Sequence, residues 1–137
     1  STIIDEEWIK KMLVSSITNI PTDKTKGGYA IPEVLTDNGD MVIFTKKDGT
    51  GWHLDKGGRL TLHFELDLET RKPYSDPDGE RMEVGYIRNG EPVSAFFDKA
   101  KEFTYTITAE EAGEYYFYAE NWTAGYVIIA SGEIRGE

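Results

Sequence analysis

Aromatic side chains near the end of the chain are the residues best suited to bind a ligand. The segment Gly113–Asn121 is rich in tyrosine, and its side chains should alternate between the two faces of a strand. One face would carry Tyr115, Phe117 and Ala119, and the other Tyr116, Tyr118 and Glu120. With the first face in the core, Tyr116 and Tyr118 form an exposed pair able to stack on sugar rings or anchor a protein. Alternatively, a second layer covers this face and the pair packs inside.

Three more aromatic residues are expected in turns. Trp122 and Tyr126 flank the turn after Asn121, and Trp52 follows a Gly-Thr-Gly loop. Loop aromatics on a β-scaffold recur in binding sites, although they also plug the ends of sandwiches. The predicted ligand-binding set is therefore Trp52, Tyr116, Tyr118, Trp122 and Tyr126.

The densest group of carboxylates lies between Asp67 and Glu83. Oxygen-rich loops bind calcium when their carboxylates converge, and Asp76, Asp78 and Glu80 are the calcium candidates here. The spacing differs from that of a helix-flanked calcium loop, and nearby Arg and Lys residues neutralise part of the charge. A solvated loop is the preferred interpretation, so we predict no metal site and no cofactor.

The sequence shows no recognisable catalytic group. His53 and His63 are the only imidazoles, and neither has a metal-ligand spacing. We expect His63 to be an exposed strand histidine, with a ligand or pH-sensing role as the alternative. A nucleophile elbow and a phosphate-binding loop are both missing, and no two carboxylates are marked as an acid–base pair. The prediction is a protein that is not an enzyme.

Composition narrows the class of protein further. The chain has 137 residues, 39% of them hydrophobic, which suits one domain over residues 1–137. Its net charge of −10 argues against binding nucleic acid, because phosphate recognition requires clustered Lys and Arg. Cysteine is absent, and neither a membrane span nor a signal peptide is recognisable. We expect any targeting signal or membrane anchor to lie upstream of these residues.

These side chains require a β-rich scaffold to position them. We expect one amphipathic helix over residues 5–16, docked on an open end or face, and a sandwich over residues 29–134. Asn89-Gly90 predicts a two-residue hairpin. The predicted fold is an all-β antiparallel sandwich, jelly-roll or immunoglobulin-like. Its eight strands are Tyr29–Thr36, Met41–Lys46, Arg59–Leu68, Met82–Arg88, Pro92–Phe97, Glu102–Thr108, Gly113–Asn121 and Tyr126–Ile134.

Two patterns resemble known families. Gly113 and Tyr115 resemble the Gly-x-Tyr corner of many extracellular sandwiches, in which the tyrosine locks a turn. The order of Gly51–Gly57, Val84–Ile87, Ala109–Tyr118 and Val127–Ile134 resembles C-terminal extracytoplasmic domains of Gram-positive, antirepressor-type membrane metallopeptidases and related surface proteins. That resemblance implies a sensory or ligand-binding domain outside the membrane. The chain lacks the family's His-Glu-x-x-His zinc helix, so no catalytic residue is carried over.

Together these features predict a non-catalytic, extracytoplasmic sensor or binding module of a Gram-positive surface or membrane protein. The expected partner is a small ligand, a glycan or a protein, and the expected location is extracellular or at the cell surface. Two alternatives stay open: a carbohydrate-binding module that uses exposed aromatics, and a structural interaction domain.

Overall fold

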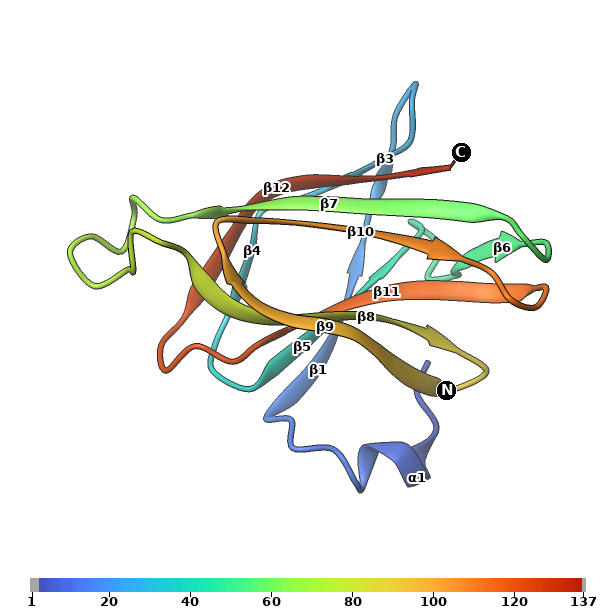
Figure 1. The fold of residues 1–137 in the computed structure, drawn as a ribbon, viewed down its shortest axis with the longest axis horizontal. Coiled ribbons are helices and arrows are strands. Elements are labelled where there is room, and N and C mark those ends of the chain that lie inside the picture. Colours follow the sequence, from blue (N-terminus) through green and yellow to red (C-terminus); the bar gives the residue numbers. More distant parts are fainter. Residues whose placement is uncertain (1–2, 137) are drawn as a thin grey trace.

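The computed structural model describes residues 3–136 as two six-stranded sheets packed face to face (Figure 1). The first sheet contains β1 (Ser16–Pro21), β5 (Asp40–Thr45), β11 (Gly113–Asn121), β8 (Glu80–Arg88) and β9 (Glu91–Ala100) in that order, and β6 (Trp52–Leu54) pairs with β11. The second contains β10 (Glu102–Thr108), β7 (Arg59–Asp67), β12 (Val127–Gly136), β3 (Tyr29–Ile31) and β2 (Asp23–Lys24) in that order, and β4 (Val34–Thr36) pairs with β12. The predicted β-sandwich is confirmed.

The core between the sheets follows from strand alternation. In β7, Leu60, Leu62, Phe64 and Leu66 are buried, while the residues between them face outward. Phe64 lies next to Phe103 of the same sheet, with ring centroids 5.0 Å apart, and 6.4 Å from the ring centroid of Phe44 in the facing sheet. Period-two hydrophobicity thus determined the inner face of this strand.

Two features of the strands differ from the prediction. The expected strand over residues 29–36 is divided into β3 and β4, which both pair with β12. The strands β1, β2 and β6 were not predicted, and β1 runs parallel to β5, from Ser16 opposite Asp40 to Pro21 opposite Thr45. The strand β1 was not recognisable from the sequence, because its two partly buried residues, Ile17 and Ile20, are three positions apart and do not give the period-two pattern of a strand.

The N-terminal prediction was wrong in extent. The helix α1 covers only Glu6–Ile9 rather than residues 5–16, and the sandwich begins at Ser16 rather than 29 and continues to Gly136. Asp5 forms no side-chain capping bond, and a helix this short depends on packing for its stability. No helix within residues 3–136 is long and apolar enough to cross a membrane.

Residues 3–15, here called the N-terminal segment, cover the outer face of the first sheet (Figure 1). Ile4 joins a second apolar cluster, whose strand members are Met41, Ile43, Ile87 and Tyr118. Two backbone bonds hold the segment in place: the Asp5 N–H donates to Gly90 O, and the Ser15 N–H to Gly39 O, both at 2.8 Å. The segment therefore docks on a face of the sandwich, as expected.

Two predicted turns are confirmed. Asn89 (φ 52°) and Gly90 (φ 77°) form the two-residue connection between β8 and β9, in the left-handed conformations that this hairpin requires. Ahead of β11, the Tyr115 hydroxyl donates to Glu111 O at 2.6 Å. This bond is the one expected of a tyrosine corner, and it locks the chain as it enters the central strand.

The chain changes sheets between β9 and β10. β9 pairs with β8 in the first sheet, and one residue later β10 begins at Glu102 and pairs with β7 in the second. Lys101, at the crossing, accepts a hydrogen bond from the Leu66 N–H through its carbonyl oxygen (2.9 Å). The crossing fixes the position of Glu102 on the outer face of the second sheet.

Replacing Ile4 tests whether the N-terminal segment is an integral part of the fold. Ile4 is 1% exposed, so Ile4→Ala should lower the free energy of unfolding by about 2 kcal/mol or more, because it leaves a cavity over the sheet. Leu13→Ala, in the same segment but 84% exposed, should change it by less than about 0.5 kcal/mol. Urea denaturation measures both values. Equal effects would mean that the segment does not pack as described.

Candidate functional site

A cleft of about 290 Å³ lies between the N-terminal segment and strands β8, β9 and β11. We call it the outer-face cleft. It combines aromatic rings with two carboxylates, and its principal lining residues are Trp8, Leu13, Glu83, Tyr118, Glu120 and Trp122. Lys11 and Ser94 also contribute to its surface.

Trp122 is held at the edge of this cleft by the turn that follows β11. Its backbone N–H donates to Arg81 O at 2.9 Å. The side-chain amide of the preceding Asn121, itself fully buried, donates to Thr36 O and Gly125 O at 3.1 Å each. The indole is 38% exposed and contacts the exposed Phe97 ring edge-on, with centroids 5.9 Å apart. A rigid turn therefore presents this ring to solvent.

The two carboxylates of the cleft come from neighbouring strands. Glu83 of β8 and Glu120 of β11 are register partners. The Tyr118 hydroxyl donates to Glu83 Oε2 at 2.6 Å, and burial followed by this bond raises the pKa of Tyr118. Glu120 is 3% exposed, and its buried Oε2 has no hydrogen-bond partner among the described residues.

The environment of Glu120 changes its acidity. Burial, and then the nearby charge of Glu83, raise the pKa of Glu120 from 4.5 to about 7. A carboxyl group in an apolar setting resists ionisation because the charged form loses its hydration. Its proton is therefore exchanged near neutral pH rather than in acid, and its Oε2 has no hydrogen-bond partner among residues 3–136.

Two of the predicted aromatic residues are buried rather than exposed. Trp52 lies in strand β6, not in a loop, is 5% exposed and packs edge-on against Tyr29 (centroids 5.3 Å apart). Tyr118 is 1% exposed beneath the N-terminal segment, so the expected exposed pair with Tyr116 is wrong. The alternative, a covered second face, is confirmed. Tyr116 is half-buried, and its hydroxyl donates to Glu114 Oε1 at 3.2 Å.

Tyr126 reaches solvent but lies away from the cleft. It is 38% exposed, and the Arg71 guanidinium lies 4.8 Å from its ring centroid. Of the five predicted residues, the structure thus brings together only Tyr118 and Trp122 in the cleft. Tyr118 is buried, and Trp122 contributes an exposed surface.

Two of the three calcium candidates are paired with basic side chains. Asp76 pairs with Lys99, and this bond lowers the pKa of Asp76. The buried Glu80 pairs with Arg71 at 3.2 Å. The exposed Asp78 donates its backbone N–H to Asp76 Oδ1 in a turn. Two of the three carboxylates thus face protein cations, which disfavours calcium binding at this loop.

A larger hollow of about 480 Å³ lies beside the loop that contains Pro73. Its described lining includes Leu68, Lys72, Ser75 and Lys101 but no aromatic ring. The outer-face cleft is the stronger candidate, because it joins aromatic surface to a buried polar group without a partner.

Comparisons with known proteins identify no family. No family model matches the chain, and no curated protein matches it. Three solved structures are similar in shape. The C-terminal CBM6 of LamC, a marine laminarinase from Zobellia galactanivorans, has a TM-score of 0.46 at 13% identity, over 85% of this chain and 87% of that one. The CBM1 of BiXyn10A in its apo form has a TM-score of 0.42 at 12% identity, over 98% and 86%. The secreted serine protease VesC from Vibrio cholerae has a TM-score of 0.37 at 14% identity, over 85% and 22%.

Sequence reasoning gave no role to most residues of the cleft, among them Glu120, Glu83 and Trp8. It placed Glu120 on the same strand face as Tyr118 but gave it no role, although an acid within a mostly apolar strand was the available signal. Glu83 falls in the predicted strand Met82–Arg88, as the structure confirms, but nothing in the sequence indicated that it lies beside Glu120. Trp8 lies in α1, and no local pattern shows that it borders a cleft.

Stability should depend on the protonation of Glu120. The folded protein binds this proton more tightly than the unfolded chain does. The protonated Glu120 therefore contributes fully to the free energy of unfolding below about pH 4.5, and this contribution is lost as the pH rises through 7. Glu120→Gln cannot ionise. At pH 8 its free energy of unfolding, measured with urea, should therefore exceed that of the native protein by roughly 1–3 kcal/mol. At pH 4.5 the two values should be similar.

Glu33→Gln is the matched control, because Glu33 is exposed. It should change stability little at either pH. A gain for Glu120→Gln that is the same at both pH values would contradict a buried, titrating carboxyl group.

Proposed function

We propose that this chain is a non-catalytic carbohydrate-binding module, and that its ligand occupies the outer-face cleft. The supporting observation is the exposed Trp122 ring beside Glu120, a buried carboxyl group with an oxygen that lacks a hydrogen-bond partner among the described residues. Of the predicted alternatives, this one agrees best with the lining of the cleft.

The chemistry of the lining suits a sugar. Sugar rings have apolar faces that stack on indole rings, and Trp8 and Trp122 both line the cleft. The hydroxyl groups of a sugar donate and accept hydrogen bonds. Possible partners in the cleft are the Lys11 ammonium, the Ser94 hydroxyl and the Glu83 carboxylate. A hydroxyl that reached the floor would also supply the donor that Glu120 lacks.

Charge and size narrow the ligand further. Two carboxylates in the cleft and a net charge of −10 disfavour phosphorylated or acidic ligands. The volume of about 290 Å³ lies near the lower end of the range for small-molecule sites, roughly 300–1,000 Å³. One or two neutral sugar rings fit these limits better than a long stretch of polysaccharide.

The wider context is also part of this proposal. An extracellular or cell-surface location, a Gram-positive source and a position as the C-terminal domain of a membrane metallopeptidase stay predictions from the sequence. The upstream part of the gene tests them, since a signal peptide, membrane spans or a zinc-protease motif would be visible there.

Glycoside hydrolysis is a second candidate, favoured by one observation. Glycosidases pair a carboxyl group of raised pKa with a second carboxylate, and Glu120 and Glu83 are neighbours of this kind. The bond from Tyr118 to Glu83 and the burial of Glu120 favour binding instead. Release of reducing ends from soluble polysaccharides, abolished in Glu120→Gln, would favour the enzyme.

Replacing Trp122 tests carbohydrate binding directly. Binding would be measured by calorimetry and tryptophan fluorescence with soluble β-1,3-glucan, xylan and bacterial cell-wall glycan fragments. Trp122→Ala and Trp8→Ala should each weaken binding of the recognised glycan by about tenfold or more, because each removes a stacking surface.

Tyr74→Ala is the matched control, since Tyr74 is an aromatic residue that is 83% exposed and outside the cleft. It should leave the affinity unchanged. The proposal fails if no glycan in the panel binds, or if the two tryptophan variants bind as tightly as the native protein.

A further inference from the structure

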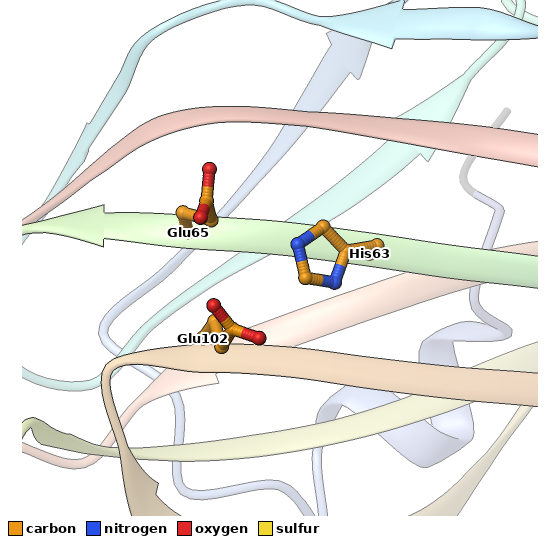
Figure 2. A group of neighbouring side chains, drawn as sticks. All are labelled: His63, Glu65 and Glu102. Carbon is orange, nitrogen blue, oxygen red and sulfur yellow. The ribbon is translucent and has the colours of Figure 1, made fainter.

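Three side chains with metal-binding atoms lie together on the outer face of the second sheet (Figure 2). They are His63, Glu65 and Glu102, and one ligand atom from each lies within 4.8 Å of the others. His63 and Glu65 are two residues apart on β7 and so share a face, opposite to the buried Leu62 and Phe64. Glu102, at the start of β10, is the register partner of Glu65. Strand pairing therefore assembles the group.

The imidazole ring is held in an orientation that suits metal binding. His63 Nδ1 lies 2.8 Å from Thr104 Oγ1, its register partner on β10. When Nδ1 carries the proton and donates it to Thr104, Nε2 keeps its lone pair for a ligand bond. In Figure 2 one ring nitrogen is turned toward the two carboxylates. Metal-binding histidines commonly donate a hydrogen bond from the ring nitrogen that does not bind the metal.

The two carboxylates of this group form no ion pair with a Lys or Arg of the described residues. Glu65 and Glu102 lie directly opposite each other on adjacent strands, an arrangement that is unfavourable for like charges. Glu133, opposite His63 on β12, does have a partner, Arg135 at 2.9 Å. A bound dication would remove the repulsion between Glu65 and Glu102.

We propose that His63, Glu65 and Glu102 form a surface site for a divalent transition-metal ion of the zinc type. One imidazole nitrogen and two carboxylate oxygens match the ligands that zinc accepts, whereas calcium and magnesium prefer oxygen alone. Ligand atoms of a tetrahedral zinc lie about 3.3 Å apart, given bond lengths near 2.0 Å. Glu65 and Glu102 are exposed, so small rotations of their side chains close the remaining gap.

The site would join two strands without forming part of the cleft. It lies on the second sheet, whereas the outer-face cleft lies on the first, so the two proposals stand on different residues. Three protein ligands leave one tetrahedral position to water or to a group from a partner. A metal ion here would link β7 to the start of β10, next to the crossing between the sheets.

Zinc titration of the metal-free, untagged protein tests the site. Calorimetry should show one zinc ion bound per chain, and the midpoint of thermal unfolding should rise as zinc is added, because the metal binds only the folded arrangement. His63→Gln and Glu102→Gln should each weaken zinc binding by about tenfold or more and remove the thermal shift. Circular dichroism confirms that each variant keeps the β-fold.

The other histidine provides a matched control. His53 is exposed, and its Nε2 lies 3.2 Å from Asp55 Oδ1, but among the described residues it belongs to no group of three metal-binding side chains. His53→Gln should bind zinc as the native protein does. Proton–nitrogen NMR of the imidazoles should show zinc shifting the Nε2 resonance of His63 and not the resonances of His53.

The proposal is overturned if the native protein binds no zinc, or if His63→Gln retains native affinity. It is also overturned if His53→Gln abolishes binding. The proposal is likewise overturned if calcium binds as tightly as zinc and His63→Gln does not weaken that binding. The protein would then attract cations non-specifically through its acidic residues.

Discussion

The burial of the apolar outer face of the first sheet is the interaction on which the rest of this structure depends. β11 lies in the middle of that sheet and is apolar on both sides: Phe117 and Ala119 enter the core, while Tyr118 faces away from it. Exposed, the outer side would leave Met41, Ile43 and Tyr118 in water. The N-terminal segment removes that surface from solvent, and its short helix and irregular chain are shaped by the sheet beneath rather than by helix propensity.

Covering the face has an electrostatic consequence. Glu120 shares the outer side of β11 with Tyr118, so the same layer that buries the tyrosine also buries a carboxyl group. Its pKa rises to about 7, since burial disfavours the ionised form and Glu83 adds a second negative charge. A buried carboxylate oxygen without a hydrogen-bond partner among residues 3–136, next to the exposed Trp122, is the observation on which the proposed binding site rests.

The outer face of the second sheet is polar and open, in contrast to the covered apolar face of the first. Side chains of β7 point alternately into the core and outward. His63 and Glu65 point outward, where the surface is polar and open to solvent. Polar residues at such positions are expected, yet Glu65 opposite Glu102 is an unfavourable choice for a sheet without a cation. The two faces thus carry the two proposed sites: a cleft that contains one buried and one half-buried carboxyl group, and an exposed set of metal-binding atoms.

The sequence by itself determined the parts that depend on near neighbours. Alternation identified the inner faces of β7 and β11, Asn89-Gly90 identified a hairpin, and Gly113 with Tyr115 identified a locked corner, because each is specified within a few residues. Only the tertiary structure decided which side of β11 is covered, that Trp52 is buried, and that Glu83 and Glu102 lie beside Glu120 and Glu65. Those outcomes depend on contacts between segments far apart in the chain, and local patterns carry no information about which distant strand or segment completes a face.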